Sequence, residues 1–259
     1  MDYDIKDILG SKMYLIKDDV GLSKQLRESG IREPASTKVI QSIIKPDWVC
    51  IDIGANLGYY ALLEAKHCKF VYAIEPVKTS FETLNKSIKL NGYENIKAYN
   101  LAISNQNGTQ DIIISHRNNW STMLDMTIVT DKYKQRFNRF YKGIEKTETL
   151  TLDDFVRDNN INKINFIRMD VEGYEVEIIK RADHAFSLMP AGSFLTIEVH
   201  SGLYKNRKPF VGMLNKILKT GFKVICGTHK EISIKLTKEN LMYRLYNRGA
   251  CLQVFFKKG

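Results

Sequence analysis

The chain has 259 residues, 44% of them hydrophobic, and contains no run of 18 apolar residues. This pattern is typical of one large globular domain with a full core and argues against a membrane-spanning helix. The formal net charge of +10 is compatible with an anionic partner such as nucleic acid, and equally with a solvated lysine-rich surface.

The four cysteines, Cys50, Cys68, Cys226 and Cys251, form no C-x-x-C pair. We therefore expect reduced, mostly buried thiols rather than disulfides or a zinc site. No signal-peptide pattern opens the sequence, so we expect a cytoplasmic protein. The oligomeric state cannot be read from the sequence.

Residues 1–47 show no strand pattern strong enough for a central sheet, and we expect an N-terminal helical extension there. Pro34 opens a helix in this part, and Pro46 ends it before the first strand. Residues 48–259 are expected to form the main domain.

The segment Val49–Gly58, VCIDIGANLG, combines an apolar run, Asp52 and two glycines, and a helix-like pattern follows it. A strand, a glycine turn and a helix N-terminus in this order predict a site for a nucleotide-like ligand. Without a Cβ, Gly54 lets backbone and ligand approach closely, and the free N–H groups of the helix suit a carboxylate or phosphate. A helix that merely starts after a glycine would give the same pattern.

Glu75 follows a second apolar run, Lys69–Ile74, about 20 residues after Gly54. At this spacing a carboxylate at the end of the second strand binds ribose hydroxyls. The alternative is that Glu75 only caps the following helix; we favour ribose binding. The dinucleotide motif G-x-G-x-x-G is absent, because Asn56 and Tyr59 occupy its other glycine positions.

The rest of the chain alternates strand-like and helix-like segments. This alternation predicts an α/β fold with a mostly parallel central sheet of about seven strands, flanked by helices. Further helices are expected at 79–90, 151–159, 175–181 and 210–218. Further strands are expected at 96–101, 108–115, 164–169, 194–199, 222–226, 232–236 and 252–256.

Residues 116–147 are too long for a plain connection and predict an inserted helical or lid segment. Its part Lys132–Lys146 is rich in lysine and arginine, interleaved with Tyr133, Phe137, Phe140 and Tyr141. Basic residues with aromatics suit a nucleic-acid strand. At helical spacing the four aromatic residues also form one apolar stripe, which would pack the segment against the rest of the protein. We favour this interpretation.

The segment Phe166–Glu175, FIRMDVEGYE, resembles the hallmark motif of the FkbM-type methyltransferase family, which runs approximately I-K-[IM]-D-x-E-G-x-E. The resemblance spans about Gly30 to His200. The segment Met123–Thr147 departs from it by being longer and more basic. Other matching stretches, in chain order, are Gly30–Pro34, Asp52–Tyr60, Glu75-Pro76, Asn100–Ser104, Asn119–Thr122 and Leu150–Phe155.

The resemblance implies a Rossmann-like class I methyltransferase fold that binds S-adenosylmethionine and releases S-adenosylhomocysteine. In such a site Asp52 would bind the ammonium group of the cofactor, directly or through water. The N–H groups of the turn would bind the cofactor's carboxylate. A backbone N–H at Ala102 would read the adenine edge, and Glu33 would approach the methionine end. The expected cofactor-binding residues are Glu33, Asp52, Gly54, Ala55, Asn56, Gly58, Glu75, Ala102 and Asp170.

Three ionisable residues are expected at neighbouring strand ends: Asp170, Glu172 and His200. Such groups suit a general base that removes the proton of an acceptor hydroxyl. Asp170 could instead cap a helix or bind the cofactor's amino group, and His200 could be a strand-end histidine without a catalytic role. A divalent ion held by Asp170, Glu198 and His200 is an alternative that the sequence does not require.

The family's acceptors are hydroxyl groups on sugars, glycolipids and polyketides. We therefore expect an O-methyltransferase that acts on a carbohydrate, glycolipid or other small acceptor. A nucleic-acid enzyme, in particular a ribose 2′-O-methyltransferase, is the first alternative, prompted by the positive charge. A catalytically silent binding module with the same fold is the second.

Overall fold

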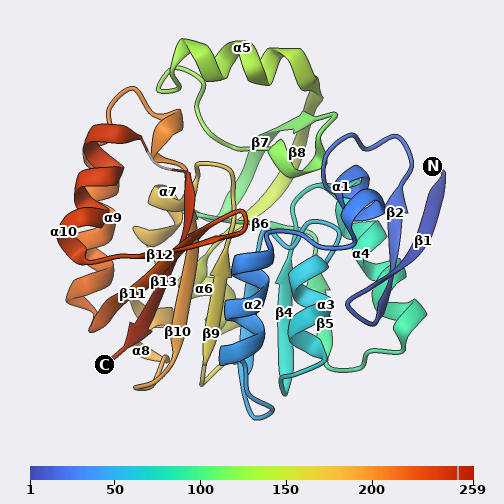
Figure 1. The fold of residues 1–259 in the computed structure, drawn as a ribbon, viewed down its shortest axis with the longest axis horizontal. Coiled ribbons are helices and arrows are strands. Elements are labelled where there is room, and N and C mark those ends of the chain that lie inside the picture. Colours follow the sequence, from blue (N-terminus) through green and yellow to red (C-terminus); the bar gives the residue numbers. More distant parts are fainter. Residues whose placement is uncertain (250) are drawn as a thin grey trace.

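The computed structural model describes residues 1–249 and 251–259. Eight strands form its main sheet: β3 (Val49–Ile53), β4 (Phe70–Ile74), β5 (Ile96–Tyr99), β9 (Phe166–Met169), β10 (Phe194–Val199), β11 (Phe222–His229), β12 (Ile232–Lys235) and β13 (Leu252–Lys258). Their order is β5-β4-β3-β9-β10-β13-β11-β12 (Figure 1). The strands from β5 to β10 run parallel, and β13 lies antiparallel between β10 and β11. The expected mostly parallel α/β sheet is confirmed.

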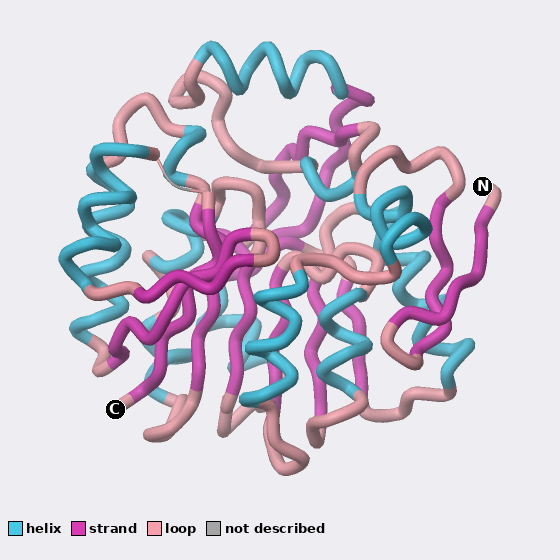
Figure 2. The backbone as a smooth tube through the Cα atoms, in the orientation of Figure 1, coloured by secondary structure: helices cyan, strands magenta, loops and turns pink. Residues whose placement is uncertain are grey.

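Helices cover both faces of this sheet (Figures 1 and 2). One face packs against α1 (Leu22–Ser29), α2 (Pro34–Ile43), α3 (Tyr59–Ala65) and α4 (Lys78–Asn91). The other packs against α6 (Leu152–Asp158), α7 (Glu175–Ile179), α8 (Asp183–Ser187), α9 (Lys208–Lys219) and α10 (Lys238–Tyr243). Two short helical segments, η2 (Ser201–Leu203) and η3 (Arg244–Arg248), complete this side.

Side chains of the central strands alternate between the two cores. In β3, Cys50 belongs to the core under α3 and α4, whereas Ile51 and Ile53 belong to the core under α6 and α7. This alternation is the two-residue period of a strand, and apolar residues on both faces let β3 lie at the centre of the sheet.

A smaller sheet holds β6 (Ala102–Ser104), β8 (Tyr141–Thr151) and β7 (Gly108–Ser115), in that order. The strand expected at 108–115 therefore belongs to this sheet and not to the main one. Between β7 and β8 the chain forms η1 (Asn118–Trp120) and α5 (Asp131–Phe140). The segment 116–147 is thus only partly helical, and α5 lies beyond the carboxyl ends of the central strands (Figure 1).

The expectation of a wholly helical N-terminal part is wrong. Residues 3–16 form the antiparallel hairpin of β1 (Tyr3–Ile8) and β2 (Ser11–Ile16). Its two-residue turn consists of Leu9 and Gly10, both with positive φ (54° and 76°), the conformation that tight hairpins favour. The domain boundary at residue 47 remains a prediction. None of the described helices is both long and apolar enough to span a bilayer.

Candidate active site

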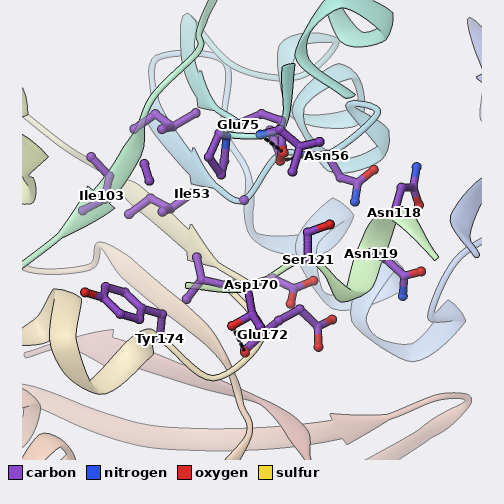
Figure 3. A pocket seen from close by; sticks show the side chains of 18 of the residues that line it. Ile53, Asn56, Glu75, Ile103, Asn118, Asn119, Ser121, Asp170, Glu172 and Tyr174 are labelled. Carbon is purple, nitrogen blue, oxygen red and sulfur yellow. Dashed lines mark hydrogen bonds between the residues drawn. The ribbon is translucent and has the colours of Figure 1, made fainter. Parts of the chain in front are cut away.

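The first cavity lies at the carboxyl ends of β3, β4 and β9 and holds about 780 Å³ of empty space, its open mouth included. Glu75 and Asn56 lie on one side of it, and Asp170 and Glu172 on another (Figure 3). Of the residues expected to bind cofactor, those that line this cavity are Gly54, Ala55, Asn56, Glu75, Ala102 and Asp170. Open α/β sheets place their ligands at this edge.

Glu75 is fixed at the end of β4 by two backbone N–H groups. Asn56 N donates to Oε2 at 2.8 Å, and Val77 N donates to Oε1 at 2.9 Å. Burial raises the pKa of Glu75 to about 7, although these two hydrogen bonds lower it. Because each carboxylate oxygen has a second acceptor position, Glu75 can fix the turn and still accept hydrogen bonds from two hydroxyls.

The two glycines of the turn serve packing within the chain. A Cβ on Gly54 would lie 2.0 Å from the carbonyl oxygen of Asp170, and one on Gly58 would lie 2.3 Å from Cδ1 of Leu84. Both residues also have positive φ, 83° and 93°. Gly54 therefore lets the turns after β3 and β9 meet, whereas we had expected its missing Cβ to make room for ligand. Gly58 begins α3 and is not part of the cavity wall.

Asp52 is not among the residues that line the cavity, and its expected role toward the cofactor's ammonium, directly or through water, stays a prediction. It is fully buried, and Arg168 Nη1 lies 3.0 Å from its Oδ1. The strand register explains this pairing, since Asp52 of β3 and Arg168 of β9 are direct partners. Arg168 also lines the cavity and donates to Asp170 Oδ2 at 2.9 Å, so Asp52 acts on the cavity through Arg168.

Asp170 combines two guanidinium partners with one free oxygen. Its Oδ2 lies 2.9 Å from Arg168 and 3.5 Å from Arg32, while its buried Oδ1 has no hydrogen-bond partner among the described residues. Burial alone would raise the pKa of Asp170, but the two arginines outweigh it and hold that pKa below its ordinary value. Asp170 is therefore a carboxylate at neutral pH with one acceptor oxygen to spare.

Glu33 faces away from the first cavity. It precedes α2 with a positive φ of 43°, accepts a hydrogen bond from Tyr60 Oη at 2.9 Å and pairs with Arg32 at 2.9 Å. Its side chain lines a second cavity, and its expected approach to the methionine end of the cofactor stays a prediction.

The second cavity adjoins the first and shares Arg32, Asn119 and Glu172 with it. It holds about 1340 Å³ of empty space, its open mouth included. Its wall contains Glu198 and His200 from the end of β10 and aromatic residues from η1 and α5. Asp170 and Glu172 thus lie at the first cavity, and His200 at the second, with Glu172 between them.

His200 is oriented by Glu175, a residue the sequence analysis did not single out. His200 Nδ1 lies 2.5 Å from Glu175 Oε1, and both side chains are almost fully buried. The ring's Nε2 is directed to Glu172 at 3.6 Å and Glu198 at 3.7 Å. Burial alone would lower the pKa of His200, but Glu175 and Glu172 outweigh it and raise that pKa well above its ordinary value.

The neighbouring carboxyl groups hold protons unusually tightly. Burial raises the pKa of Glu172 to about 8, although His200 lowers it, and burial together with Asp170 raises the pKa of Glu198. His200, Glu172 and Glu198 thus form a cluster of ionisable groups with raised pKa values in the wall of the second cavity.

Two groups of residues in this wall have the geometry of metal ligands: Asp170, Glu172 and His200, and Glu198, His200 and Cys251. The trio expected from sequence, Asp170 with Glu198 and His200, is split between them. His200 fits either group, because its other ring nitrogen is held by Glu175, the outer-shell arrangement common for metal-binding histidines.

Sequence reasoning missed Arg32, Arg168 and Glu175. Arg168 could have been noticed as the charged residue inside the otherwise apolar strand FIRM, a position that requires a buried partner. Glu175 closes the motif FIRMDVEGYE, but only its hydrogen bond to His200 shows its role.

The strand order, with one antiparallel strand inserted beside β10, and a cavity at the carboxyl ends of the parallel strands define a class I methyltransferase fold. The sequence model of the Methyltransferase FkbM domain matches residues 52–224. The chain belongs to this family and is an S-adenosylmethionine-dependent methyltransferase.

Two relatives have methyltransferase names. The chain is 26% identical over 236 residues to 2-O-methyltransferase NoeI of Sinorhizobium fredii, covering 85% of this chain and 95% of the relative. It is 26% identical over 169 residues to Hexuronic acid methyltransferase AglP of Haloferax volcanii, covering 61% of this chain and 58% of AglP.

Solved structures share the fold. Trm5b from Pyrococcus abyssi superposes with a TM-score of 0.50 at 14% identity, over 98% of this chain and 55% of Trm5b. SMU.1697c from Streptococcus mutans, in complex with SAH, also gives a TM-score of 0.50 at 11% identity. This superposition covers 88% of this chain and 99% of SMU.1697c. The chain thus spans about half of Trm5b and nearly all of SMU.1697c.

Proposed function

We propose that the protein is an O-methyltransferase that transfers the methyl group of S-adenosylmethionine to a hydroxyl of a carbohydrate or other small acceptor. The observation that carries this proposal is the buried pair of His200 and Glu175 in the wall of a second cavity beside the first, with the Nε2 of His200 turned toward Glu172 and Glu198. The names of the two relatives, a 2-O-methyltransferase and a hexuronic acid methyltransferase, support a saccharide acceptor.

The first cavity fits the cofactor. Glu75 offers two oxygens to ribose hydroxyls, and the unpartnered Oδ1 of Asp170 is the acceptor that an ammonium group requires. The N–H groups of Ala55 and Gly54 are already bonded to the carbonyl of Ile74, so the carboxylate of the methionine is assigned to Arg32 instead of the glycine turn. When bound, the cofactor supplies an electrophilic methyl group carried on a sulfonium.

The residues at the second cavity remove the proton of the acceptor. His200 in its neutral form accepts the hydroxyl proton at Nε2, and Glu175 stabilises the resulting imidazolium through Nδ1. Glu172, on the wall between the cavities, orients the hydroxyl and exchanges the proton with His200. Because His200 and Glu172 hold protons above their ordinary pKa values, turnover should rise with pH through about 8 and beyond.

A metal-assisted variant of the same reaction would use Asp170, Glu172 and His200 to hold a divalent ion against the acceptor oxygen. We favour the reaction without metal, because the Oδ2 of Asp170 is committed to two arginines and its Oδ1 is assigned to the cofactor's ammonium. Turnover that persists in a chelator supports this choice, and turnover restored only by Mn²⁺ or Mg²⁺ contradicts it.

The test is methyl transfer from radiolabelled S-adenosylmethionine to two acceptor pools, a saccharide fraction and total RNA. We expect alkali-stable label in the saccharide fraction with the wild type and none with His200→Asn. Cofactor binding by this variant should be unchanged, which shows that the cofactor site is intact. Label in RNA alone would replace the proposal by the nucleic-acid alternative, and label in neither pool would favour a silent binding module.

A further inference from the structure

A cationic pocket lies on the outer side of α5. It is formed by the side chains of Arg117, Trp120, Lys132, Gln135, Arg136, Arg139 and Phe140. Four of these residues are cationic, and no carboxylate is among the described residues that line the pocket. So many like charges repel one another unless an anion lies between them.

Two guanidinium groups of this pocket gather around one indole. Arg136 lies 3.7 Å and Arg117 lies 4.7 Å from the ring centroid of Trp120. The Nε of Arg117 is buried without a hydrogen-bond partner among the described residues, which leaves an N–H donor to be satisfied. An oxyanion would satisfy it, since guanidinium donors match carboxylate and phosphate oxygens.

The cationic pocket adjoins the second cavity, because Trp120 and Arg136 line both. A single molecule can therefore extend from His200 to the arginines of α5. Figure 1 shows α5 spanning the region above the carboxyl ends of β9 and β10, where His200 lies. Within the second cavity, Glu172 and Glu198 lie beside His200, and Arg136 is shared with the cationic pocket.

We propose that the acceptor is an anionic saccharide, whose charged group is bound by Arg117, Arg136 and Arg139 while an uncharged hydroxyl lies at His200. This proposal rests on the proposed function and names the acceptor class of the same site. The anionic group is a phosphate, sulfate or carboxylate that is separated from the methylated hydroxyl along the acceptor.

The distribution of charge favours a saccharide over RNA. A ribose 2′-hydroxyl lies directly beside a phosphate, so an RNA enzyme needs a free cation next to the reacting group. Here the arginine that lines both cavities, Arg32, is assigned to the cofactor's carboxylate and is also paired with Glu33 at 2.9 Å and Asp170 at 3.5 Å, so it is not available to a phosphate of the acceptor. The indole of Trp120 is also occupied by Arg117, Arg136 and the ring of Phe140, which limits base stacking.

The test is calorimetry on the full chain saturated with S-adenosylhomocysteine, with pyrophosphate, glucose 6-phosphate, glucuronate, glucose and a hexauridylate as probes. We expect pyrophosphate and at least one charged sugar to bind, glucose to bind at least tenfold more weakly, and R136Q/R139Q to weaken the charged probes tenfold or more. A phosphate and a carboxylate group are then distinguished by which charged sugar binds better.

The matched control is R157Q/K89Q, which removes the same charge from residues that line neither cavity nor the cationic pocket. This control should bind the probes as the wild type does. Equal binding by R136Q/R139Q and the wild type, or no binding of any charged probe, would overturn the proposal. Hexauridylate that binds tenfold more tightly than the charged sugars, and is lost in R136Q/R139Q, would replace the saccharide by RNA. Failure of the proposed function would appear separately, as absence of S-adenosylhomocysteine binding.

Discussion

The imidazole of His200 donates through Nδ1 to the carboxylate of Glu175, at 2.5 Å and out of contact with solvent. Glu175 also accepts a hydrogen bond from Gly173 N at 3.0 Å, which ties the pair to the turn after β9. This arrangement fixes which ring nitrogen faces the second cavity and favours the protonated ring. Glu175 is thus a positioning residue whose effect is measured at His200.

Replacing Glu175 by Gln should lower the pKa of His200, because the largest electrostatic contribution that raises it is removed. NMR titration of the imidazole protons measures this directly, with His200→Asn to assign the signal. The affinity for S-adenosylhomocysteine should change less than threefold. An unchanged pKa in the Gln variant would show that Glu175 does not control the charge of His200.

The stability of the protein should depend on the protonation of Glu172. Its pKa of about 8 in the folded protein lies above the ordinary 4.5, so ionisation destabilises the fold progressively as pH rises from about 4.5 to above 8. Glu172→Gln cannot ionise and should gain stability relative to the wild type at pH 9, by up to about 5 kcal/mol for a pKa shift from 4.5 to about 8. Urea unfolding at pH 5 and pH 9 measures the free energy of unfolding of the wild type and of Glu172→Gln. A difference between the two proteins that is the same at both pH values would contradict the prediction.

Removing only one partner of the buried pair of Arg168 and Asp52 should lower the stability of the protein strongly. Arg168→Met leaves Asp52 buried without its partner and should destabilise the protein by about 3–5 kcal/mol. The double variant with Asp52→Asn should recover part of this loss, since no unpaired charge remains. A double-mutant cycle by urea unfolding measures the coupling, and strictly additive losses would show that the two residues do not stabilise each other.

Gly54→Ala tests the contact between the turns after β3 and β9. The new methyl group would collide with the carbonyl oxygen of Asp170, so we expect a loss of several kcal/mol and a large fall in cofactor affinity. Gly92→Ala is the matched control, because Gly92 has a similar positive φ of 65° but no atom near its Cβ position. Its cost should be about 1 kcal/mol. Similar losses in the two variants would mean that strain in φ, and not the collision, dominates at Gly54.

Much of the fold could be predicted because strand and helix periods are local in the sequence. The parallel strands and the cavity at their carboxyl ends follow from apolar runs such as Phe70–Ile74, which is followed by the polar residue Glu75. The hairpin of residues 3–16 was not predicted, because Gly10 is the only residue of its two-residue turn, Leu9-Gly10, that favours a turn. The strand expected at 232–236 is present as β12, although it is short and largely exposed.

Contacts between distant segments could not be predicted. The burial of Asp52 depends on which residue of β9 lies opposite it, and the role of Glu175 depends on the turn that brings it to His200. The aromatic stripe of 132–146 was only partly right. Phe137 is buried, but the helix ends at Phe140, so Tyr141 begins β8 and is 51% exposed.

The central claim is that the first cavity binds S-adenosylmethionine through Glu75. Calorimetry with S-adenosylmethionine and S-adenosylhomocysteine on the wild type and Glu75→Ala tests it most directly. We expect micromolar binding by the wild type and at least a 30-fold loss in the variant, with thermal unfolding to show that the variant is folded. A folded wild type that binds neither ligand, or a variant with unchanged affinity, would contradict the assignment of this cavity.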